Sequence, residues 1–327
     1  MAAYLILVTG AFGFIGSHLV ESIAKSGSEV VAVGHPSLGD HYLDELLKGE
    51  YATRIHPVLA DLKSFDAAAS IFQRFRPRVV YHLAAIASHR LSFNEPYLYL
   101  DNNLRTTLNV IEAARISRVS PRILFASSSS VYGENRSPLT EDLQPRPKGP
   151  YAVSKWLCEE LAKAYHRDYS LDVVIVRYFN VVGERCRSNI VFRVFADKIS
   201  SGREVEVNGR VVEGVFRPAA RDFTYVEDVV RGTILAAEKG RSGEVYNLGR
   251  GVPVSVLDVA YEMMRLFGRN VEIIQRELSP HESLEVYSDS SKARRELGWA
   301  PQVGFEEMVK RFIEWYKATY HHPPQDL

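Results

Sequence analysis

The stretch Thr9-Gly10-Ala11-Phe12-Gly13-Phe14-Ile15-Gly16 decides the fold of this chain. It follows an apolar run at residues 4–8 that suits a buried parallel strand, and it leads into an amphipathic helical pattern at residues 17–24. Gly10 permits a tight turn, Gly13 lets the backbone approach a pyrophosphate, and Gly16 lets the helix pack on the strand. The helix N-terminus offers free N–H groups to the phosphate charge. Strand, glycine turn and helix together predict a dinucleotide-binding start.

Tyr151 and Lys155 form a second pattern that carries chemistry. The preceding Gly149-Pro150 suits the first turn of a helix, on which positions i and i+4 share a face. We therefore expect Lys155 to hold its charge near the Tyr151 oxygen. A nearby cation would lower the phenol pKa, ordinarily about 10, and make Tyr151 a general base. Taken alone, the spacing fits a surface pair without chemistry; the glycine turn favours the catalytic interpretation.

Strand and helix patterns alternate over the first part of the chain, which predicts an α/β fold with a doubly wound parallel sheet. Binding is then expected beyond the carboxyl ends of the strands. After residue 180 short strands and helices are mixed, which predicts a second, smaller α/β lobe. The strands are expected near 3–9, 29–34, 54–58, 78–82, 122–127 and 172–178, and the helices near 14–26, 65–75, 98–116 and 150–169. The second lobe is expected to hold strands at 204–207 and 271–274, and helices at 256–266, 290–297 and 305–320.

Charge and composition limit the classes of function. Forty basic and forty acidic residues cancel, which removes the main argument for binding nucleic acid or an anionic membrane. No apolar run approaches eighteen residues, and the run at residues 4–8 is expected to be a first strand and not a signal peptide. Two cysteines, Cys158 and Cys186, give neither a disulfide framework nor a zinc site, so we expect no metal and a cytoplasmic location.

Further motifs stand just past the expected strands. Asp61-Leu62 follows the third strand, His82-Leu83-Ala84-Ala85 the fourth, and Ser127-Ser128-Ser129-Ser130-Val131-Tyr132-Gly133 ends the fifth. Arg177-Tyr178-Phe179-Asn180 and Arg221-Asp222-Phe223-Thr224-Tyr225-Val226 come later. In this order the motifs resemble the extended short-chain dehydrogenase/reductases of the NAD(P)-dependent sugar-nucleotide epimerase/dehydratase family. The likeness runs from Val8 to about Trp299.

The resemblance implies a Rossmann dinucleotide-binding domain at residues 1–178, to which 224–250 returns, and a mainly substrate-binding lobe at 179–327. It implies Ser128, Tyr151 and Lys155 as the catalytic set and a nucleotide-diphospho-sugar as substrate. The implied cofactor contacts are Gly10, Phe12, Gly13, Phe14, Ile15, Gly34, His35, Asp61, Leu62, Leu83, Ala84, Ala85, Tyr151, Lys155 and Tyr178. The implied substrate contacts are Arg90, Ser129, Asn180, Arg221 and Val286, and Asn103 is implied as a structural asparagine.

The implied reaction is oxidation at C4 of the sugar to a 4-keto intermediate, followed by reduction on the other face. Ser129 and Ser130 stand where 4,6-dehydratases carry an acid–base pair, and a serine hydroxyl cannot replace a tuned carboxylate. The serine turn is similar to that of UDP-glucose and UDP-glucuronate 4-epimerases, so a 4-epimerase is expected. The alternatives are an NADP-dependent 4-keto reductase or dehydratase and a dinucleotide-sensing protein without catalysis.

Three departures from the family pattern bear on the ligands. No carboxylate stands at Gly34-His35, where the adenosine ribose is usually bound, and Asp40 is too far along; NADP therefore stays open beside NAD. Ser279 replaces an arginine that grips the diphosphate, which leaves Arg221, with Arg185, Arg217 and Arg276 as alternatives. Small Val286 would admit a substituent on the sugar, or is only a core residue.

Two further expectations concern the role of Arg90 and the oligomeric state. Arg90 could meet a carboxylate or phosphate of the substrate, or could be a solvated residue at a helix start. Helices at 98–116 and 150–169 form the dimer contact in related proteins, so the resemblance also implies a homodimer.

Overall fold

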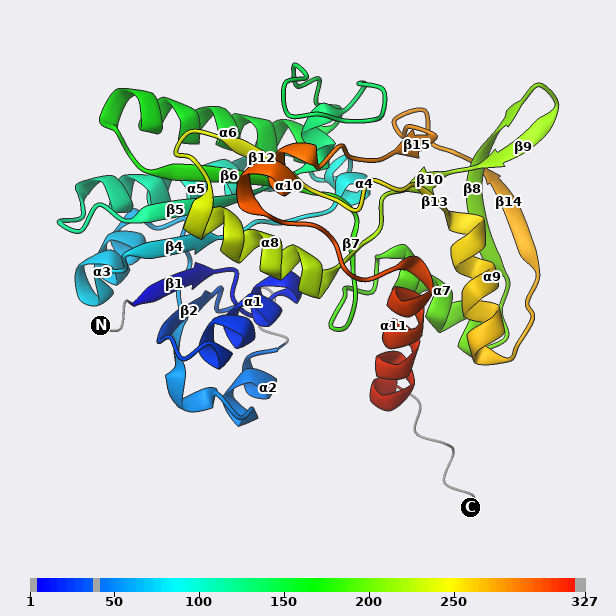
Figure 1. Ribbon diagram of the computed structural model, residues 1–327, viewed down its shortest axis with the longest axis horizontal. Helices are drawn as coiled ribbons and strands as arrows, with labels where there is room; N and C mark the ends of the chain where they lie inside the picture. The colour runs from blue at the N-terminus through cyan, green and yellow to red at the C-terminus, as the bar shows by residue number, and fades with distance from the viewer. Residues whose placement is uncertain (1–4, 38–41, 321–327) are drawn as a thin grey trace.

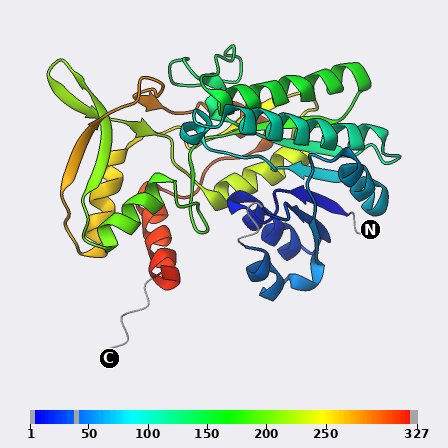
Figure 2. The same ribbon diagram turned by 180° about the vertical axis from the view of Figure 1, so that it is seen from behind.

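The computed structural model describes residues 5–37 and 42–320. The start of the first expected strand, Asp40 and the tail from residue 321 lie outside the described residues. Two unequal lobes lie side by side, with the dinucleotide-binding motifs in the larger lobe (Figures 1 and 2).

A parallel sheet forms the centre of the larger lobe, and its seven strands among the described residues have the order β12-β6-β5-β4-β1-β2-β3. This order confirms the doubly wound parallel sheet. All six expected strands are present, and β12 pairs with β6 as a seventh. The strands are β1 Ile6–Thr9, β2 Val30–Gly34, β3 Ile55–Leu59, β4 Val79–His82, β5 Arg122–Ser128, β6 Val173–Tyr178 and β12 Val245–Leu248.

Helices cover both faces of this sheet because alternate strand residues face opposite ways. Leu7 and Val31 pack with α3, α5 and α6 on one face, while Val8 and Ala32 pack with α1 and α8 on the other. These apolar strands, buried on both sides, are typical of parallel sheets. The helices are α1 Phe14–Lys25, α3 Phe65–Phe75, α5 Pro96–Ile116, α6 Pro150–Tyr169 and α8 Val226–Lys239; the short α2 Leu43–Lys48, η1 Ala52–Arg54, α4 His89–Ser92 and η2 Ser129–Tyr132 lie in the connections.

The smaller lobe is built on short sheets packed against helices. Its largest sheet has the order β14-β8-β9, and a second sheet, β13-β10-β15, lies toward the larger lobe (Figure 1). The strands are β8 Val205–Val212, β9 Val215–Pro218, β10 Ala220–Arg221, β13 Val254–Ser255, β14 Ile273–Glu277 and β15 Glu285–Val286; a two-stranded pair joins β7 Val181–Val182 to β11 Thr224–Tyr225. The helices are α7 Val191–Ser200, α9 Val256–Phe267 and α11 Phe305–Tyr320.

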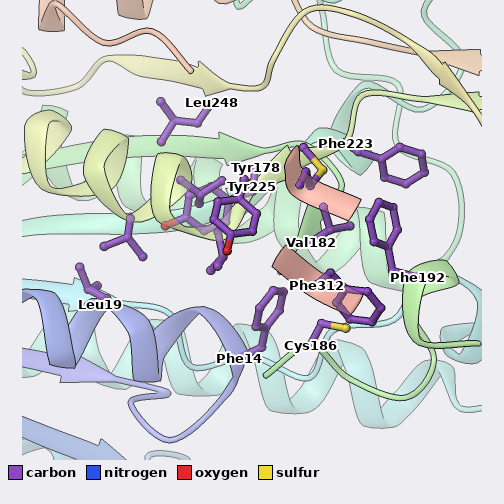
Figure 3. Close-up of a cluster of buried hydrophobic side chains, with 14 of the residues drawn as sticks. Phe14, Leu19, Tyr178, Val182, Cys186, Phe192, Phe223, Tyr225, Leu248 and Phe312 are labelled. Atoms are coloured by element: carbon purple, nitrogen blue, oxygen red, sulfur yellow. The ribbon is translucent and has the colours of Figure 1, made fainter. Parts of the chain in front are cut away.

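One continuous core joins the two lobes. Phe14 from α1 and Leu248 from β12 belong to the same buried cluster as Phe192, Phe223 and Phe312 of the smaller lobe (Figure 3). The ring centroids of Phe192 lie 5.3 Å from Phe223 and 5.5 Å from Phe312. This shared core packs the two lobes against each other.

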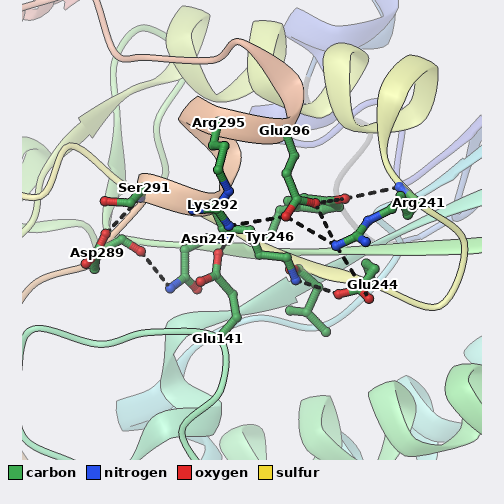
Figure 4. Close-up of polar contacts among 11 residues, drawn as sticks. Glu141, Arg241, Glu244, Tyr246, Asn247, Asp289, Ser291, Lys292, Arg295 and Glu296 are labelled. Atoms are coloured by element: carbon green, nitrogen blue, oxygen red, sulfur yellow. Dashed lines mark hydrogen bonds and ion pairs between the residues drawn. The ribbon is translucent and has the colours of Figure 1, made fainter.

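Polar contacts fasten β12 to helix α10, Ser291–Leu297, at the outer edge of the sheet (Figure 4). Lys292 Nζ lies 2.6 Å from Glu244 Oε2, and the Tyr246 hydroxyl donates to Glu296 at 3.0 Å. The backbone N–H of Asn247 donates to Glu141 at 2.7 Å. None of the helices in the described residues is both long and apolar enough to cross a membrane.

Candidate active site

The glycine turn between β1 and α1 is shaped by close backbone contacts. Gly10 has φ of +67°, and a Cβ placed on it would lie 2.9 Å from the backbone nitrogen of Ala84. A Cβ on Gly16 would lie 2.0 Å from the Gly10 oxygen, so only glycine lets the helix approach the strand this closely. Within the described chain no side chain caps α1 at Gly13. The first N–H groups of α1 thus remain for a phosphate, and the turn fits a dinucleotide pyrophosphate.

The turn after β4 is held from both sides. Thr9 Oγ1 lies 2.7 Å from His82 Nδ1 and accepts a hydrogen bond from the Ala84 N–H at 3.2 Å. Asn103 accepts from the Ile86 N–H at 2.8 Å and donates to the Ile86 oxygen at 3.0 Å. Leu83, Ala84 and Ala85 therefore lie in a fixed backbone turn directly beside the glycine turn, and Asn103 has a structural role here.

His82 is a buried neutral imidazole below this turn. Its Nε2 lies 3.2 Å from Thr107 Oγ1, so both ring nitrogens have partners. Burial, with a smaller effect from the Lys155 charge, lowers the pKa of His82 to about 3. The ring therefore supports the turn without carrying charge.

Ser128, Tyr151 and Lys155 come together where β5 and α6 meet. Tyr151 and Lys155 are on the first turns of α6, which Pro150 begins, and the Tyr151 phenol is hydrogen-bonded to the Ser128 hydroxyl. Ser128 Oγ also accepts from the Ser130 N–H at 3.2 Å, which caps η2. This arrangement brings a phenol and a hydroxyl to one point at the carboxyl end of the sheet.

The charges around Tyr151 differ from the expected ones. Burial raises the pKa of Tyr151, while the Ser128 hydrogen bond and the positive charge of Arg187 lower it. The Nζ of Lys155 lies 4.4 Å from the ring centroid of Phe125, and burial lowers the pKa of Lys155. The ammonium is held against an aromatic face in the dry interior, so the largest electrostatic effect on the phenol comes from Arg187 instead.

Arg187 was not predicted from the sequence. It lies in the loop after β7, and its guanidinium donates to the backbone oxygen of Ala87, in the turn after β4. The Arg187 side chain is exposed. Arg187 follows the Arg177-Tyr178-Phe179-Asn180 motif in a loop, and loop positions have no periodic pattern that would mark Arg187 as a site residue.

The adenosine end lies at the carboxyl ends of β2 and β3. His35 Nε2 is 3.8 Å from Asp61 Oδ1, and the Lys63 N–H donates to the same oxygen at 2.9 Å. Leu62 is buried beneath this segment. The Phe12 side chain is fully buried against Gly34. The residues expected at the adenosine end are thus neighbours.

The substrate end is formed where β10 pairs with β15, and the register places Arg221 beside Val286. Arg221 Nη2 lies 3.2 Å from Glu282 Oε2, and Arg90 Nη2 lies 3.0 Å from the other oxygen of that carboxylate. Burial lowers the pKa of Arg221. Val286 packs against the cluster that contains Val131, at the serine turn. One acidic side chain thus joins two of the arginines expected at the substrate.

The remaining candidates fall in different places. The exposed Asn180 lies just past the end of β6, and its backbone oxygen accepts from the Thr224 N–H at 3.0 Å. The Tyr178 hydroxyl is 2.9 Å from Thr233 Oγ1 inside the core, so its side chain does not face the crevice. Arg185 pairs with acidic residues of α1 and α2, and Arg276 pairs with Glu206. These two arginines are therefore engaged elsewhere.

Comparison with known proteins agrees with this geometry. Residues 7–312 match the family model described as GDP-mannose 4,6 dehydratase. The chain is 34% identical to a UDP-glucuronate 4-epimerase of Thermodesulfobacterium geofontis over 96% of both chains. The chain belongs to this family of nucleotide-sugar epimerases and dehydratases.

Solved structures of family members have the same fold. The UDP-glucuronic acid 4-epimerase from Bacillus cereus, in complex with UDP-glucuronic acid and NAD, is 32% identical with a TM-score of 0.87, covering 97% of this chain and all of that one. The UDP-glucose 4-epimerase from Thermotoga maritima, with UDP-glucose, is 31% identical with a TM-score of 0.87, again over 97% and 100%. These likenesses confirm the predicted family, the α/β fold and the expected class of enzyme, a nucleotide-sugar 4-epimerase; the Bacillus cereus structure holds NAD, one of the two cofactors left open by the sequence.

The family model takes its description from a dehydratase, but the serine turn of this member lacks dehydratase chemistry. Ser129 and Ser130 occupy η2, directly after Ser128, and the Ser130 hydroxyl is buried without a hydrogen-bond partner among the described residues. No carboxylate follows Ser128 at these two positions. Elimination of water needs a positioned acid and base, so this turn favours epimerisation.

Proposed function

We propose that this chain is a 4-epimerase of UDP-uronic acids in which Ser128, Tyr151 and Lys155 are the catalytic residues. The observation that carries the substrate class is the exposed Arg187 guanidinium, which donates to the Ala87 oxygen in the turn after β4 and lowers the pKa of Tyr151. A cation that acts on the reacting phenol suits an anionic substituent on the sugar. The UDP-glucuronate 4-epimerase relatives support the same class of substrate.

Each catalytic side chain has a separate task. Tyr151 takes the proton of the 4-hydroxyl and returns it after the sugar has presented its other face, while Ser128 hydrogen-bonds the reacting oxygen. Lys155, one turn along α6, would hold the nicotinamide ribose. When bound, the nicotinamide cofactor supplies the two-electron oxidation and reduction at C4. Proton and electron pair return to the sugar, so net redox is zero.

The substrate lobe supplies the anion contacts. Arg221, the less exposed of the two arginines that pair with Glu282, would meet the diphosphate once Glu282 releases it, and a guanidinium suits two phosphate oxygens at once. Arg90 is more exposed and shares Glu282, so it would take part in the same exchange of partners. Asn180 and Ser129 would meet the substrate from the strand ends, and Val286 would form the wall near the sugar.

We further propose that the enzyme is a homodimer through the outer faces of α5 and α6. These helices pack on each other and lie together at the outside of the larger lobe (Figures 1 and 2). Tyr97, Leu98, Leu108 and Tyr169 are exposed there, which is more apolar surface than a solvated helix pair needs. Both cysteines are buried and unpaired, which fits the cytoplasm as its compartment.

The test is C4 inversion of a panel of nucleotide sugars, followed by chromatography. UDP-glucuronate should be converted to UDP-galacturonate without consumption of added nicotinamide cofactor. Its kcat/KM should be at least tenfold higher than that of UDP-glucose. Arg187→Gln should reduce this preference, and Arg187→Lys, which keeps the charge, should retain most of it. A preference for the neutral sugar would reject the uronate class, and stoichiometric oxidation of added NADPH would indicate a reductase. Light scattering should give twice the chain mass.

A further inference from the structure

We propose that this enzyme discriminates weakly between NAD and NADP, because the Phe12 ring fills the space of the side chain that would select the adenosine ribose. This inference rests on the proposed function only in that the dinucleotide is its cofactor. In dinucleotide-binding folds of this kind, a carboxylate about 20 residues after the glycine turn binds the ribose 2′-hydroxyl and thereby favours NAD. Gly34 stands at that position as the last residue of β2.

The space for a side chain at position 34 is filled. A Cβ placed on Gly34 would lie 2.1 Å from Phe12 Cδ2 and 2.6 Å from Cε2, far inside van der Waals contact. The Phe12 side chain has no exposed surface. A phenyl ring at position 12 and any side chain at position 34 therefore exclude each other, and the two residues act as one unit.

Phe12 cannot easily move aside because the turn that carries it is fixed. The Ala11 N–H donates to the Val33 oxygen at 3.1 Å, and the Gly13 N–H donates to the Gly10 oxygen at 3.2 Å. The same turn must meet the pyrophosphate. The Phe12 ring therefore lies between the glycine turn and Gly34 at the end of β2. The absence of a carboxylate is therefore built into the packing and not a matter of one substitution.

The polar side chains that remain at this edge are His35 and Asp61. His35 accepts from the Ser37 N–H at 3.0 Å through Nδ1, and its Nε2 faces Asp61 at 3.8 Å. Asp61 follows β3, not β2, and its carboxylate accepts from the Lys63 N–H. Without a carboxylate at position 34, the end of β2 itself neither attracts a free 2′-hydroxyl nor repels a 2′-phosphate. The dissociation constants for the two dinucleotides should then be similar.

The experiment measures binding and not turnover. NADP and NAD are titrated against the fluorescence of NADH bound to the full-length protein, without nucleotide sugar, for the wild type, Phe12→Ala, Gly34→Asp and the double variant Phe12→Ala/Gly34→Asp. The two wild-type dissociation constants should agree within about tenfold, and Phe12→Ala, which opens space but adds no carboxylate, should keep that ratio. The double variant should favour NAD at least tenfold more than the wild type. Gly34→Asp alone should lower the melting temperature, because its side chain meets the ring.

A wild-type preference for either dinucleotide above about tenfold would overturn the inference. So would a double variant that folds but keeps the wild-type ratio. If the double variant does not fold, the ratio of the NAD and NADP dissociation constants in the wild type and in Phe12→Ala still tests the inference. Because no sugar nucleotide is present, a protein that binds both dinucleotides and epimerises nothing would refute the proposed function and leave this inference standing.

Discussion

Glu159 and Arg177 form a bidentate ion pair directly behind the serine strand. Arg177 Nε lies 3.0 Å from Glu159 Oε1 and Nη2 lies 2.7 Å from Oε2, and the two side chains are 0% and 1% exposed. The Ser127 hydroxyl donates to the same carboxylate. Glu159 is one helical turn beyond Lys155 on α6, and Arg177 is on β6. The pair therefore fixes the helix that carries Tyr151 to the strands beside Ser128.

Glu159→Gln should destabilise the protein by about 3–5 kcal/mol, because it leaves the Arg177 guanidinium buried without a counter-charge. Urea unfolding gives the value. The double variant Glu159→Gln/Arg177→Met, which removes both charges, should recover at least half of the loss in a double-mutant cycle. Purely additive effects of the two substitutions would show that the pair does not act as a unit.

Tyr151→Phe should lower kcat by at least about 10²-fold, since positioned proton transfer contributes typically 10²–10⁴-fold. The phenyl ring keeps the packing, so the melting temperature and the affinity for NADH should change little. Ser128→Ala should also reduce kcat, while Ser129→Ala/Ser130→Ala, the matched change in the same turn, should be mild. Near-normal turnover in Tyr151→Phe would reject the phenol as the base, and a large loss in the double serine variant would mean that the wrong serine was chosen.

Local signals allowed most of the larger lobe to be predicted. The helices α3 and α6 have the predicted bounds, 65–75 and 150–169, because Ser64 caps one and Pro150 begins the other. The short α2 and α4 and the hairpin of β8 and β9 were not predicted, since a helix of one or two turns or a hairpin tip depends on its neighbours.

The site was predictable where a motif fixes the backbone, and not where two distant segments meet. The glycine turn and Ser128 stand at strand ends that share one edge of the sheet, and Tyr151 lies in the first turn of α6, which packs against β5. The pairing of Glu282 with Arg90 and Arg221 joins residues far apart along the chain, and no local pattern encodes it. Lys155 turns toward Phe125 for a similar reason, because burial and not spacing decides where an ammonium lies.

Arg221→Gln should raise KM for the nucleotide sugar by about 10- to 100-fold with a much smaller change in kcat. A charge-assisted contact to the diphosphate, far from C4, is made equally in the ground and transition states, so its loss affects binding. Arg276→Gln is the matched control, because that arginine pairs with Glu206 on the outer hairpin. Steady-state kinetics with each variant measures both constants. An unchanged KM in Arg221→Gln, or an equal effect of Arg276→Gln, would contradict the assignment.

Acid should destabilise the protein through His82. The unfolded chain binds a proton on this ring near pH 6.5, whereas the buried ring resists protonation down to about pH 3. Between these values the unfolded state holds more protons, so stability falls as pH falls. Going from pH 7 to pH 5 should cost about 2 kcal/mol from this group alone. Urea unfolding of His82→Gln, which cannot titrate, should show a loss smaller by about that amount, and an identical loss would exclude the effect.

Arg187→Gln should move the acidic limb of the pH profile of kcat/KM to higher pH. The positive charge of Arg187 lowers the Tyr151 pKa, against burial that raises it. Because a cation stabilises the phenolate, its removal must raise the pKa, and a higher pH is then needed to form the base. The profile is measured with a neutral substrate, UDP-glucose, so that lost contacts to a uronate do not enter. Arg187→Lys keeps the charge and should leave the limb near its wild-type position, whereas a limb that moves to lower pH in Arg187→Gln would show that another group sets the acidic side.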